Sequence, residues 1–406
     1  MERMQDPNGS DTTACEAQRQ QRFVQQLPKI ELHAHLNGSI RRSTLRELAA
    51  AKNVDPSNAF ILTRWPKTLS EAFDVFRVIH SCVTTLADVE RLAFELGQDL
   101  EEDGVVYAEI RTTPRAMDAA PHSDGSRYDG GDEEKSGLVR YVQAVLSGFS
   151  RYSNSTEARG SNKTVLRLLL SIDRAKHNTT QALAIVDLAH RYRHQGVLGI
   201  DLSGDPTKGN FLDFIPALQH ARSLGLKITL HAGEVQGQDK EMTSMLKFHP
   251  DRMGHCCFVS PSNLDRLQKS GIPIELCLTS NLLSNSVTEL KKHHFGLHYN
   301  HVESTHEVRD GENAGPTICC ISTDDSGVFG SSLSNEYRLV MDNFNLSERQ
   351  TFHLARRTLE ATFLIRPTPD SSTTARQKAQ RKYQQDYKRI HAAYRHFYDS
   401  WEWNKE

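Results

Sequence analysis

KIELHAHLNGS, the sequence of residues 29–39, joins a short apolar run to a polar end that carries two histidines. Seven later segments have the same design, in which a run rich in Val, Ile and Leu ends in polar residues. They are VVYAEIRTTPR from Val105, VLRLLLSIDR from Val165, VLGIDLSGDP from Val197, KITLHAGE from Lys227, RMGHCCF from Arg252, IPIELCLTSN from Ile272 and TICCISTDDSG from Thr317. Nearly continuous apolar runs are typical of parallel strands that helices cover on both faces. The chain therefore contains eight candidate parallel strands.

Helical patterns lie between these runs. Two examples are residues 68–83, TLSEAFDVFRVIHSCV, and residues 180–196, TQALAIVDLAHRYRHQG. The second of these segments ends in a glycine suited to a helix C-cap. Eight strands that alternate with helices predict an α/β fold of the TIM-like (β/α)8 barrel type with additional helices. In such barrels the reactive groups gather at the C-terminal ends of the strands. The polar clusters of this chain stand at those ends.

The sequence divides into three predicted parts. We expect a flexible N-terminal segment over 1–26, a barrel domain over 27–365 and a helical tail over 366–406. Polar, glycine-containing insertions near 116–137 and 302–315 predict exposed loops within the barrel domain. The tail is basic and aromatic, which also suits a helix that binds nucleic acid or a membrane. We favour a terminal helix that packs its Tyr and Trp side chains on the barrel.

Composition limits the classes of partner. The chain has 406 residues, a formal net charge of −2 and a pI near 6.8, so no whole-protein field attracts nucleic acid or an acidic membrane. No apolar run is long enough to span a membrane, and the first residues are polar where a signal peptide needs an apolar stretch. The seven cysteines show neither a disulfide-framework spacing nor a CxxC motif. We therefore expect a cytosolic protein with reduced cysteines, and a monomer because no apolar surface stripe stands out.

Three histidines and one aspartate predict a metal site. His33 and His35 are two residues apart in a strand, so their side chains project from the same face. His231 ends the fifth apolar run and Asp324 ends the eighth, which brings a third imidazole and a carboxylate to the same rim of the barrel. Two hydrogen-bonded core histidines would explain the HxH motif alone, but not the whole set. Three nitrogen ligands and one oxygen ligand suit one Zn²⁺ ion with a position left for water.

A zinc-bound water needs groups that carry protons. Glu234 follows His231 by three residues, and His255 ends the sixth apolar run, so both can reach the water or the atom it attacks. Taken alone, Glu234 is also explained as a carboxylate at a helix N-terminus, and His255 as a core histidine beside two cysteines. Beside the metal ligands, the catalytic interpretation is the stronger one. No lysine ends the fourth run, DLSGDP, where a two-metal barrel would need a bridging carboxylated lysine, so the sequence predicts one ion.

The order of the motifs resembles the adenosine deaminase family. HxH, SGDP, HAGE, GH and STDD follow one another from about Leu27 to Phe363, across essentially the whole barrel. Within that family, the segments LPKIELHAHLNGSI, RTTPR, DLSGDPT, ELCLTSN and HHFG are most similar to the adenosine deaminase-like subgroup, which acts on N(6)-methyl-AMP. The resemblance implies a barrel of the metal-dependent hydrolase type.

The resemblance also implies a role for each site residue. By this resemblance, zinc is held by His33, His35, His231 and Asp324. The resemblance further implies that Glu234 donates a proton to purine N1 and that His255 orients the zinc water and helps to deprotonate it. It also implies that Asp325 hydrogen-bonds N7, that the Gly204 backbone lies near N3, and that the substrate is contacted by His35, His80 and Asp173. Spacing alone does not single out His80 or Asp173. The simpler explanation of His80 is a half-buried helix histidine.

Asn37 separates this chain from adenosine deaminases that resemble it, which have HLDG where this chain has HLNG. A carboxylate at that position would repel a 5′-phosphate, whereas an amide can donate a hydrogen bond. The TTPR segment supports a phosphate site independently, because Thr112 and Thr113 offer hydroxyls and Arg115, after Pro114, offers a guanidinium fork. A capped loop with a surface arginine is the alternative.

The predicted reaction is hydrolysis at purine C6, from N(6)-methyl-AMP and water to IMP and methylamine. The expected partner is thus a small-molecule purine monophosphate, and neither nucleic acid nor a membrane. An adenosine or AMP deaminase is the alternative, and the choice depends on Asn37 and Arg115. A non-catalytic nucleotide-binding barrel ranks below both, because every proposed ligand and proton carrier is intact.

Overall fold

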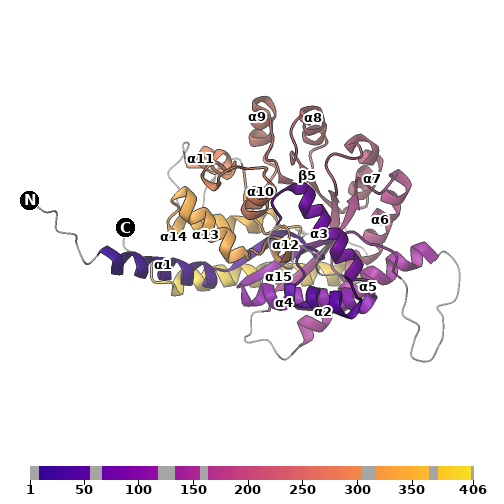
Figure 1. The fold of residues 1–406 in the computed structure, drawn as a ribbon, viewed down its shortest axis with the longest axis horizontal. Coiled ribbons are helices and arrows are strands. Elements are labelled where there is room, and N and C mark those ends of the chain that lie inside the picture. The colour runs from indigo at the N-terminus through magenta and orange to yellow at the C-terminus, as the bar shows by residue number, and fades with distance from the viewer. Residues whose placement is uncertain are drawn as a thin grey trace, which may run out of the picture.

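Eight strands pair side by side in the order in which they occur in the chain, and every pairing is parallel. A computed structural model describes residues 9–54, 66–117, 133–155, 163–303, 317–364 and 374–403. The strands are β1 Lys29–His35, β2 Val105–Thr112, β3 Val165–Asp173, β4 Val197–Ser203, β5 Lys227–Ala232, β6 Arg252–His255, β7 Ile274–Leu276 and β8 Cys319–Ile321. These eight strands, with helices around them, confirm the predicted (β/α)8 barrel (Figure 1).

Helices follow or cover the strands. The α-helices are α1 Gly9–Gln26, α2 Arg42–Ala51, α3 Leu69–Cys82, α4 Leu86–Glu102, α5 Glu133–Asn154, α6 Thr179–Tyr192, α7 Phe211–Ser223, α8 Asp239–Phe248, α9 Pro261–Ser270, α10 Leu278–Leu283, α11 Phe295–Glu303, α12 Ser326–Phe329, α13 Leu333–Phe344, α14 Glu348–Arg357 and α15 Thr374–Ser400. Both helices quoted above from the sequence, α3 and α6, are present. The second ends through a short 3₁₀ turn at Gly196, whose φ of 112° is the left-handed conformation that glycine allows.

The barrel closes between β1 and the loop that follows β8. The amide of His35 donates to the carbonyl of Asp324 at 2.8 Å, and the amide of Asp324 donates to the carbonyl of His33 at 2.8 Å. This single bridge is the seam of the barrel, and it places the chain after β8 directly beside the HxH segment.

Charged side chains fill much of the barrel interior. Arg111 on β2 contacts Asp201 on β4 at 3.1 Å and Glu275 on β7 at 2.9 Å. Arg252 on β6 contacts Glu275 at 2.6 Å and Glu109 on β2 at 2.7 Å, and none of these side chains is exposed. Paired charges of this kind add little net stability but are costly to break, because removal of one partner leaves a buried charge. The network fixes the positions of the carboxylates below the rim.

The two terminal helices lie against one another (Figure 1). The ring of Phe23 on α1 packs edge-on against Phe397 on α15 and against Trp401, with centroids 5.8 and 5.3 Å apart. Tyr383 and Tyr394 of α15 are also buried, as expected for a packing helix. Residues 9–26 of the segment that we expect to be flexible form α1, and Phe23 and Val24 near its end are fully buried.

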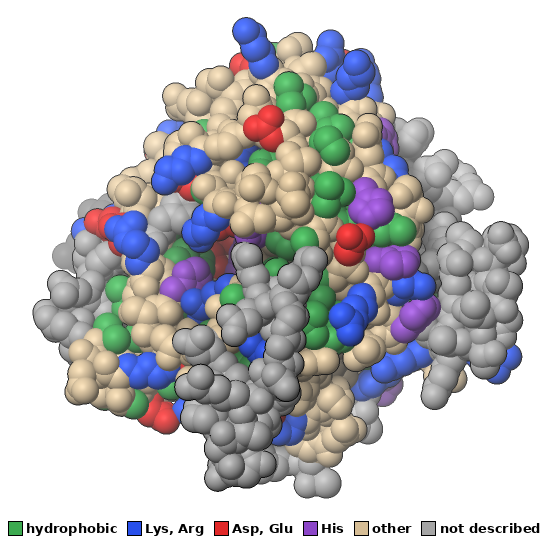
Figure 2. Space-filling view, turned by 90° about the vertical axis from the view of Figure 1, so that its right-hand side faces the viewer, with side chains coloured by type: hydrophobic (Ala, Val, Ile, Leu, Met, Phe, Trp, Pro, Cys, Tyr) green, Lys and Arg blue, Asp and Glu red, His purple; other side chains and the backbone are tan. Residues whose placement is uncertain are grey.

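The remaining expectations for the chain organisation meet the structure only in part. The described helices include none with the length and apolar content needed to cross a bilayer. Most of the two polar insertions lies outside the described residues, and α5 begins and α11 ends within their predicted limits. The division into segment, barrel and tail stays a prediction. Figure 2 shows one face of the molecule, where Lys and Arg side chains are more frequent than Asp and Glu side chains and are spread among uncharged ones.

Candidate metal and nucleotide site

A cavity of about 410 Å³ opens at the C-terminal ends of the strands. Every site residue predicted from the sequence lines this cavity except His33, which lies beneath it. Its lining includes His35, Asn37, His80, Thr112, Thr113, Pro114, Arg115, Asp173, Gly204, His231, Glu234, His255, Asp324 and Asp325, together with residues that the sequence did not single out. Strands that are far apart in the chain thus deliver their polar ends to one place.

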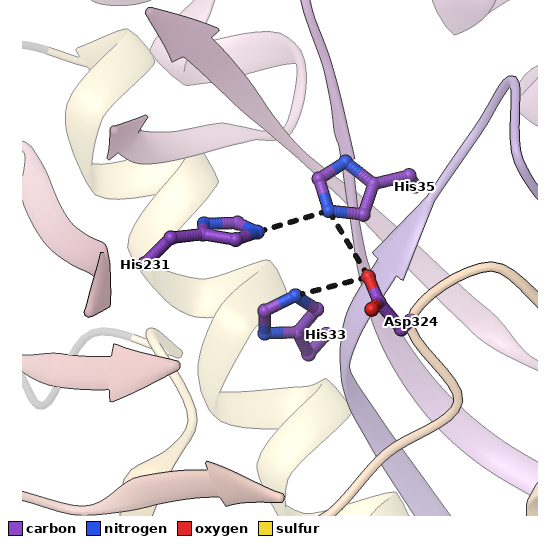
Figure 3. A group of neighbouring side chains, drawn as sticks. All are labelled: His33, His35, His231 and Asp324. Atoms are coloured by element: carbon purple, nitrogen blue, oxygen red, sulfur yellow. Dashed lines mark hydrogen bonds and ion pairs between the residues drawn. The ribbon is translucent and has the colours of Figure 1, made fainter. Parts of the chain in front are cut away.

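Three imidazoles and one carboxylate converge at the floor of the cavity (Figure 3). The Nε2 atoms of His35 and His231 are 3.1 Å apart, and Asp324 Oδ1 lies 3.4 Å from His35 Nε2 and 3.3 Å from His33 Nε2. A tetrahedral zinc ion with bonds of about 2.0–2.1 Å holds neighbouring ligand atoms about 3.3 Å apart. The four side chains therefore fit one such ion, and this cluster could bind a metal.

Two buried carboxylates orient two of these imidazoles, those of His33 and His231. Glu275 Oε2 lies 2.7 Å from His33 Nδ1, and Asp201 Oδ1 lies 2.9 Å from His231 Nδ1. Each carboxylate accepts the Nδ1 proton, so the lone pair of each Nε2 faces the cluster, as in metal-ligating histidines. Nε2 of His33 is buried and makes no hydrogen bond, as expected of an atom placed for a metal.

Sequence reasoning missed both of these carboxylates. Asp201 and Glu275 occur inside apolar runs, at GIDLS and PIELC, where a strand buried on both faces has no water to solvate a charge. A lone acidic residue in such a run was the available signal. The partner of each carboxylate lies on another strand, which the sequence does not show.

Burial favours the protonated form of two carboxyl groups that line the cavity, Glu234 and Asp325. Burial raises the pKa of Glu234 to about 7, the imidazole of His231 opposes the shift and the charge of Asp324 adds to it. Burial and the neighbouring charge of Asp324 raise the pKa of Asp325 well above its usual range. Oδ1 of Asp325 is buried without a hydrogen-bond partner. Both shifts favour the protonated carboxyl, the form that can donate a proton or a hydrogen bond.

His255 faces the same space from the end of β6. Its Nε2 lies 3.9 Å from Glu234 Oε1 and 3.9 Å from Asp324 Oδ2, distances longer than a hydrogen bond. Burial and the nearby imidazoles lower the pKa of His255 to about 3, although Asp324 opposes them, so the ring is neutral at pH 7. The φ angles of His255 and Asp324 are 59° and 65°, a strained conformation for residues other than glycine.

The other end of the cavity contains the predicted phosphate residues. The amide nitrogen of Asn37 is 3.2 Å from the hydroxyl of Tyr141 on α5, and that hydroxyl is 2.8 Å from Thr112 Oγ1. Asn37 Oδ1 has no hydrogen-bond partner although it is buried. Tyr141 was not predicted, because nothing in its helical surroundings marks it in the sequence. The hydroxyl of Tyr141 therefore contacts both Asn37 and Thr112 and holds them in place.

Arg115 is partly engaged by the protein itself. Its guanidinium donates to the backbone carbonyls of His80 and Val83 at the end of α3, and its buried Nε makes no hydrogen bond. The arginine thus ties α3 to the rim of the cavity. A surface arginine, the alternative from the sequence, does not describe this position.

A second basic group lies at the same end of the cavity. Lys176, which was not predicted, lines the cavity and contacts Asp173 at 2.7 Å.

Gly204 has a φ of 99°, and a Cβ there would lie 2.4 Å from Asp173 Oδ1, so only glycine fits this close approach.

Apolar side chains from α3 and α12 cover one wall of the cavity. They are Leu69, Ala72 and Phe76 on α3 and Phe329 on α12, beside Leu36 after β1. Their periodicity in the sequence indicates a helix face but not the surface that this face covers. The cavity thus combines a polar floor, a polar outer end and an apolar wall that suits a flat ring.

Comparisons with known proteins agree with this arrangement. The family model described as adenosine deaminase matches residues 28–372. The N6-mAMP deaminase of Arabidopsis thaliana is 40% identical over 362 residues, which cover 84% of this chain and 94% of that protein. The N6-Methyl-AMP deaminase of Mus musculus is 37% identical over 82% of this chain and 86% of its own length.

Solved structures give the same result. The crystal structure of the Arabidopsis N6-mAMP deaminase superposes with a TM-score of 0.72 at 37% identity, over 90% of this chain and 99% of that one. A structure described as an ADAL–IMP complex has the same TM-score and identity, and covers 91% of this chain and 99% of that one. The family match spans the barrel and the whole cavity. The chain therefore belongs to the adenosine deaminase family and is a hydrolytic deaminase that acts on a C–N bond.

Proposed function

We propose that this protein is a zinc-dependent deaminase of purine nucleoside monophosphates that converts N(6)-methyl-AMP and water into IMP and methylamine. The observation that carries the proposal is the convergence of three imidazole nitrogens and one carboxylate oxygen beneath Glu234 and Asp325 in one cavity. When bound by His33, His35, His231 and Asp324, Zn²⁺ supplies the Lewis acidity that makes water a nucleophile at neutral pH.

The residues of the chain divide the remaining work. A C–O bond forms at C6 and the C6–N bond breaks, and the two protons that the water loses end up on N1 of the ring and on the leaving amine. The protonated carboxyl of Glu234 donates to N1, and the protonated carboxyl of Asp325 donates a hydrogen bond to N7. His255 orients the water, and the amide of Gly204 lies near N3. His35, His80 and Asp173 contact the nucleotide at the walls of the cavity.

The choice of a nucleotide rests on the outer end of the cavity. Asn37, Thr112, Thr113, Pro114 and Arg115 line it, without a carboxylate at position 37. The relatives named N6-methyl-AMP deaminase and the solved ADAL complexes with IMP and GMP support a purine monophosphate as the ligand. A single zinc ion, a cytosolic location and a monomeric state belong to the same proposal.

A direct comparison of substrates tests the proposal. The metal content of the purified full-length protein is measured by mass spectrometry, and kcat/KM is determined for N(6)-methyl-AMP, AMP, N(6)-methyladenosine and adenosine. We expect one zinc per chain and the highest kcat/KM for N(6)-methyl-AMP. A preference for adenosine or AMP would favour the alternative deaminase, and no turnover of any purine by the zinc-loaded protein would leave only a binding barrel.

Glu234→Gln tests the proton donor. The amide keeps the shape of the carboxyl but cannot donate the required proton, so kcat should fall about 10²–10⁴-fold. Glu95→Gln is the control, because Glu95 is a buried carboxyl on α4 that contacts Thr44 and Arg91 and does not line the cavity. Undiminished turnover in Glu234→Gln would contradict the assigned role.

A further inference from the structure

His255 is the last residue of a hydrogen-bonded chain that starts at a backbone amide. The amide of Phe295 donates to Nδ1 of His293 at 3.0 Å. Nε2 of His293 lies 3.0 Å from Oδ1 of Asn281, and Nδ2 of Asn281 lies 3.1 Å from Nδ1 of His255. His293, Asn281 and His255 are at most 3% exposed, so water does not compete for these contacts.

The direction of this chain follows from its first link. A backbone amide is always a donor, so Nδ1 of His293 must be an acceptor and its ring proton must be on Nε2. That proton can only point to the oxygen of Asn281, which resolves the usual ambiguity between the amide oxygen and nitrogen. The Asn281 nitrogen then faces His255 and donates to its Nδ1. The reverse direction would set two N–H groups against one another at Phe295 and His293.

We infer that Asn281 and His293 are positioning residues that fix the neutral ring of His255 with its proton on Nε2, so that His255 donates a hydrogen bond to the attacking water and does not remove its proton. This inference rests on the proposed function for the identity of the water and the substrate. It replaces the deprotonating role that the family resemblance implies for His255. The orientation of the ring itself follows from the contacts alone.

The position of Nε2 indicates where the proton of the water goes instead. Glu234 Oε1 and Asp324 Oδ2 both lie 3.9 Å from this nitrogen, which leaves space for a bridging oxygen atom. A ring nitrogen that already holds a proton has no free lone pair, so Nε2 of His255 cannot accept the proton of the water. Glu234 gives its own proton to N1 and then accepts the proton that the water loses, so the carboxyl returns to its starting form and the balance of the hydrolysis is unchanged.

A second contact holds the backbone of His255. Nε2 of His294 lies 2.6 Å from the carbonyl oxygen of His255, and because a carbonyl only accepts, His294 is the donor. The rings of His293 and His294 stack with centroids 4.1 Å apart. The two histidines of the HHFG segment therefore fix the side chain and the backbone of the same residue, whose φ angle of 59° is strained.

Nitrogen NMR on the zinc-loaded protein with ¹⁵N-labelled histidine tests the ring state without any substrate. We expect His255, assigned by comparison with His255→Gln, to show a protonated Nε2 and an unprotonated Nδ1. A protonated Nδ1 in the wild-type protein would overturn the inference. Because this measurement involves no turnover, it can fail or succeed independently of the proposed function.

Asn281→Asp tests the function of the chain. An ionised carboxylate of the same shape can only accept, so it should pull the His255 proton to Nδ1 and leave Nε2 as an acceptor. A wrong histidine tautomer is costly in catalysis, and we expect kcat to fall at least about 100-fold with little change in KM. Asn263→Asp is the matched control, since Asn263 is equally buried but pairs with Thr243 and Asp239 on α8. A loss of kcat without a change of tautomer, or a change of tautomer without a loss of kcat, would overturn the inference.

Discussion

At the scale of single residues, Asn37 combines an engaged nitrogen with an unengaged oxygen. Its nitrogen faces the hydroxyl of Tyr141, and its buried oxygen has no hydrogen-bond partner. We predict that Asn37→Asp lowers kcat/KM for N(6)-methyl-AMP by about 10–100-fold more than for N(6)-methyladenosine, because a carboxylate repels the phosphate in a poorly hydrated cavity. Steady-state kinetics with both compounds measure this ratio.

Asn178→Asp is the control for this substitution. Asn178 caps α6 at an exposed position, where its oxygen accepts from the amide of Gln181, and an aspartate caps equally well. This variant should leave the ratio of the two substrates unchanged. If Asn37→Asp slowed both substrates to the same extent, Asn37 would have no part in the choice of a nucleotide.

His80 lines the cavity close to two cations, Arg115 and Lys176. Burial, with Arg115 and Lys176 adding to it, lowers the pKa of His80 from 6.5 to about 4, and Asp173 opposes the shift. Because the folded state binds fewer protons than the unfolded state between these values, stability is complete above pH 6.5 and falls as the pH approaches 4.

The prediction for His80 concerns the free energy of unfolding at acidic pH. A shift from 6.5 to about 4 corresponds to about 3 kcal/mol at pH 4, which His80→Gln should recover at that pH but not at pH 7. Urea unfolding of both proteins across this range measures the difference. His396→Gln, at an exposed position of α15, is a control that should follow the wild-type curve. Parallel curves for wild type and His80→Gln would show that burial does not depress this pKa.

At the scale of elements, the contact between α4 and α5 depends on a glycine. A Cβ at Gly148 would lie 2.4 Å from the carbonyl oxygen of Glu90 and 2.6 Å from Cβ of Ala93, and the backbone of α4 cannot move away cheaply. We predict that Gly148→Ala destabilises the protein by about 1–3 kcal/mol. Because α5 also carries Tyr141, the variant should raise KM for nucleotides.

Denaturant unfolding and nucleotide kinetics measure both effects of Gly148→Ala. Ser147→Ala, at the exposed neighbouring position, is the control and should leave both quantities near the wild-type values. A stable Gly148→Ala variant with an unchanged KM would show that α4 and α5 separate easily and that Tyr141 does not depend on their contact.

The elements themselves were predictable to different degrees. Strands β1 to β6 begin at the first residue of their predicted apolar runs, because burial on both faces imposes a local and continuous pattern. Strands β7 and β8 begin two residues later than their runs, at Ile274 and Cys319. The packing of α1 could not be predicted, because Phe23 is one aromatic residue in a polar stretch and its partners Phe397 and Trp401 are distant in the sequence.

The residues of the candidate site were likewise predictable to different degrees. His33, His35, His231 and Asp324 could be predicted because each ends an apolar run and the barrel rule brings such ends together. Asp201, Glu275 and Tyr141 could not, because each acts through a contact between elements that no local pattern records. The chain from Phe295 to His255 also depends on hydrogen-bond direction, which requires coordinates.

At the scale of the whole molecule, the metal cluster and the seam of the barrel coincide. His33 and His35 stand on β1 and Asp324 follows β8, and the two backbone hydrogen bonds between these segments are the closure of the barrel. A bound ion would therefore link the two edges of the sheet, besides joining β5 through His231. An ion that binds only the folded state adds about 4 kcal/mol when its free concentration is 1,000 times its Kd.

Removal of the metal should therefore loosen the seam before the rest of the barrel. We predict that chelation lowers the melting temperature by several degrees and speeds hydrogen exchange at the amides of His35 and Asp324 more than at the amides of β3 and β4. Exchange measured by mass spectrometry with and without chelator, and after zinc is restored, tests this order. In His231→Ala, which lacks one ligand from outside the seam, the effect of chelator should shrink. Uniform acceleration over all strands would mean that the ion stabilises the barrel as a whole and that the seam has no special dependence on it.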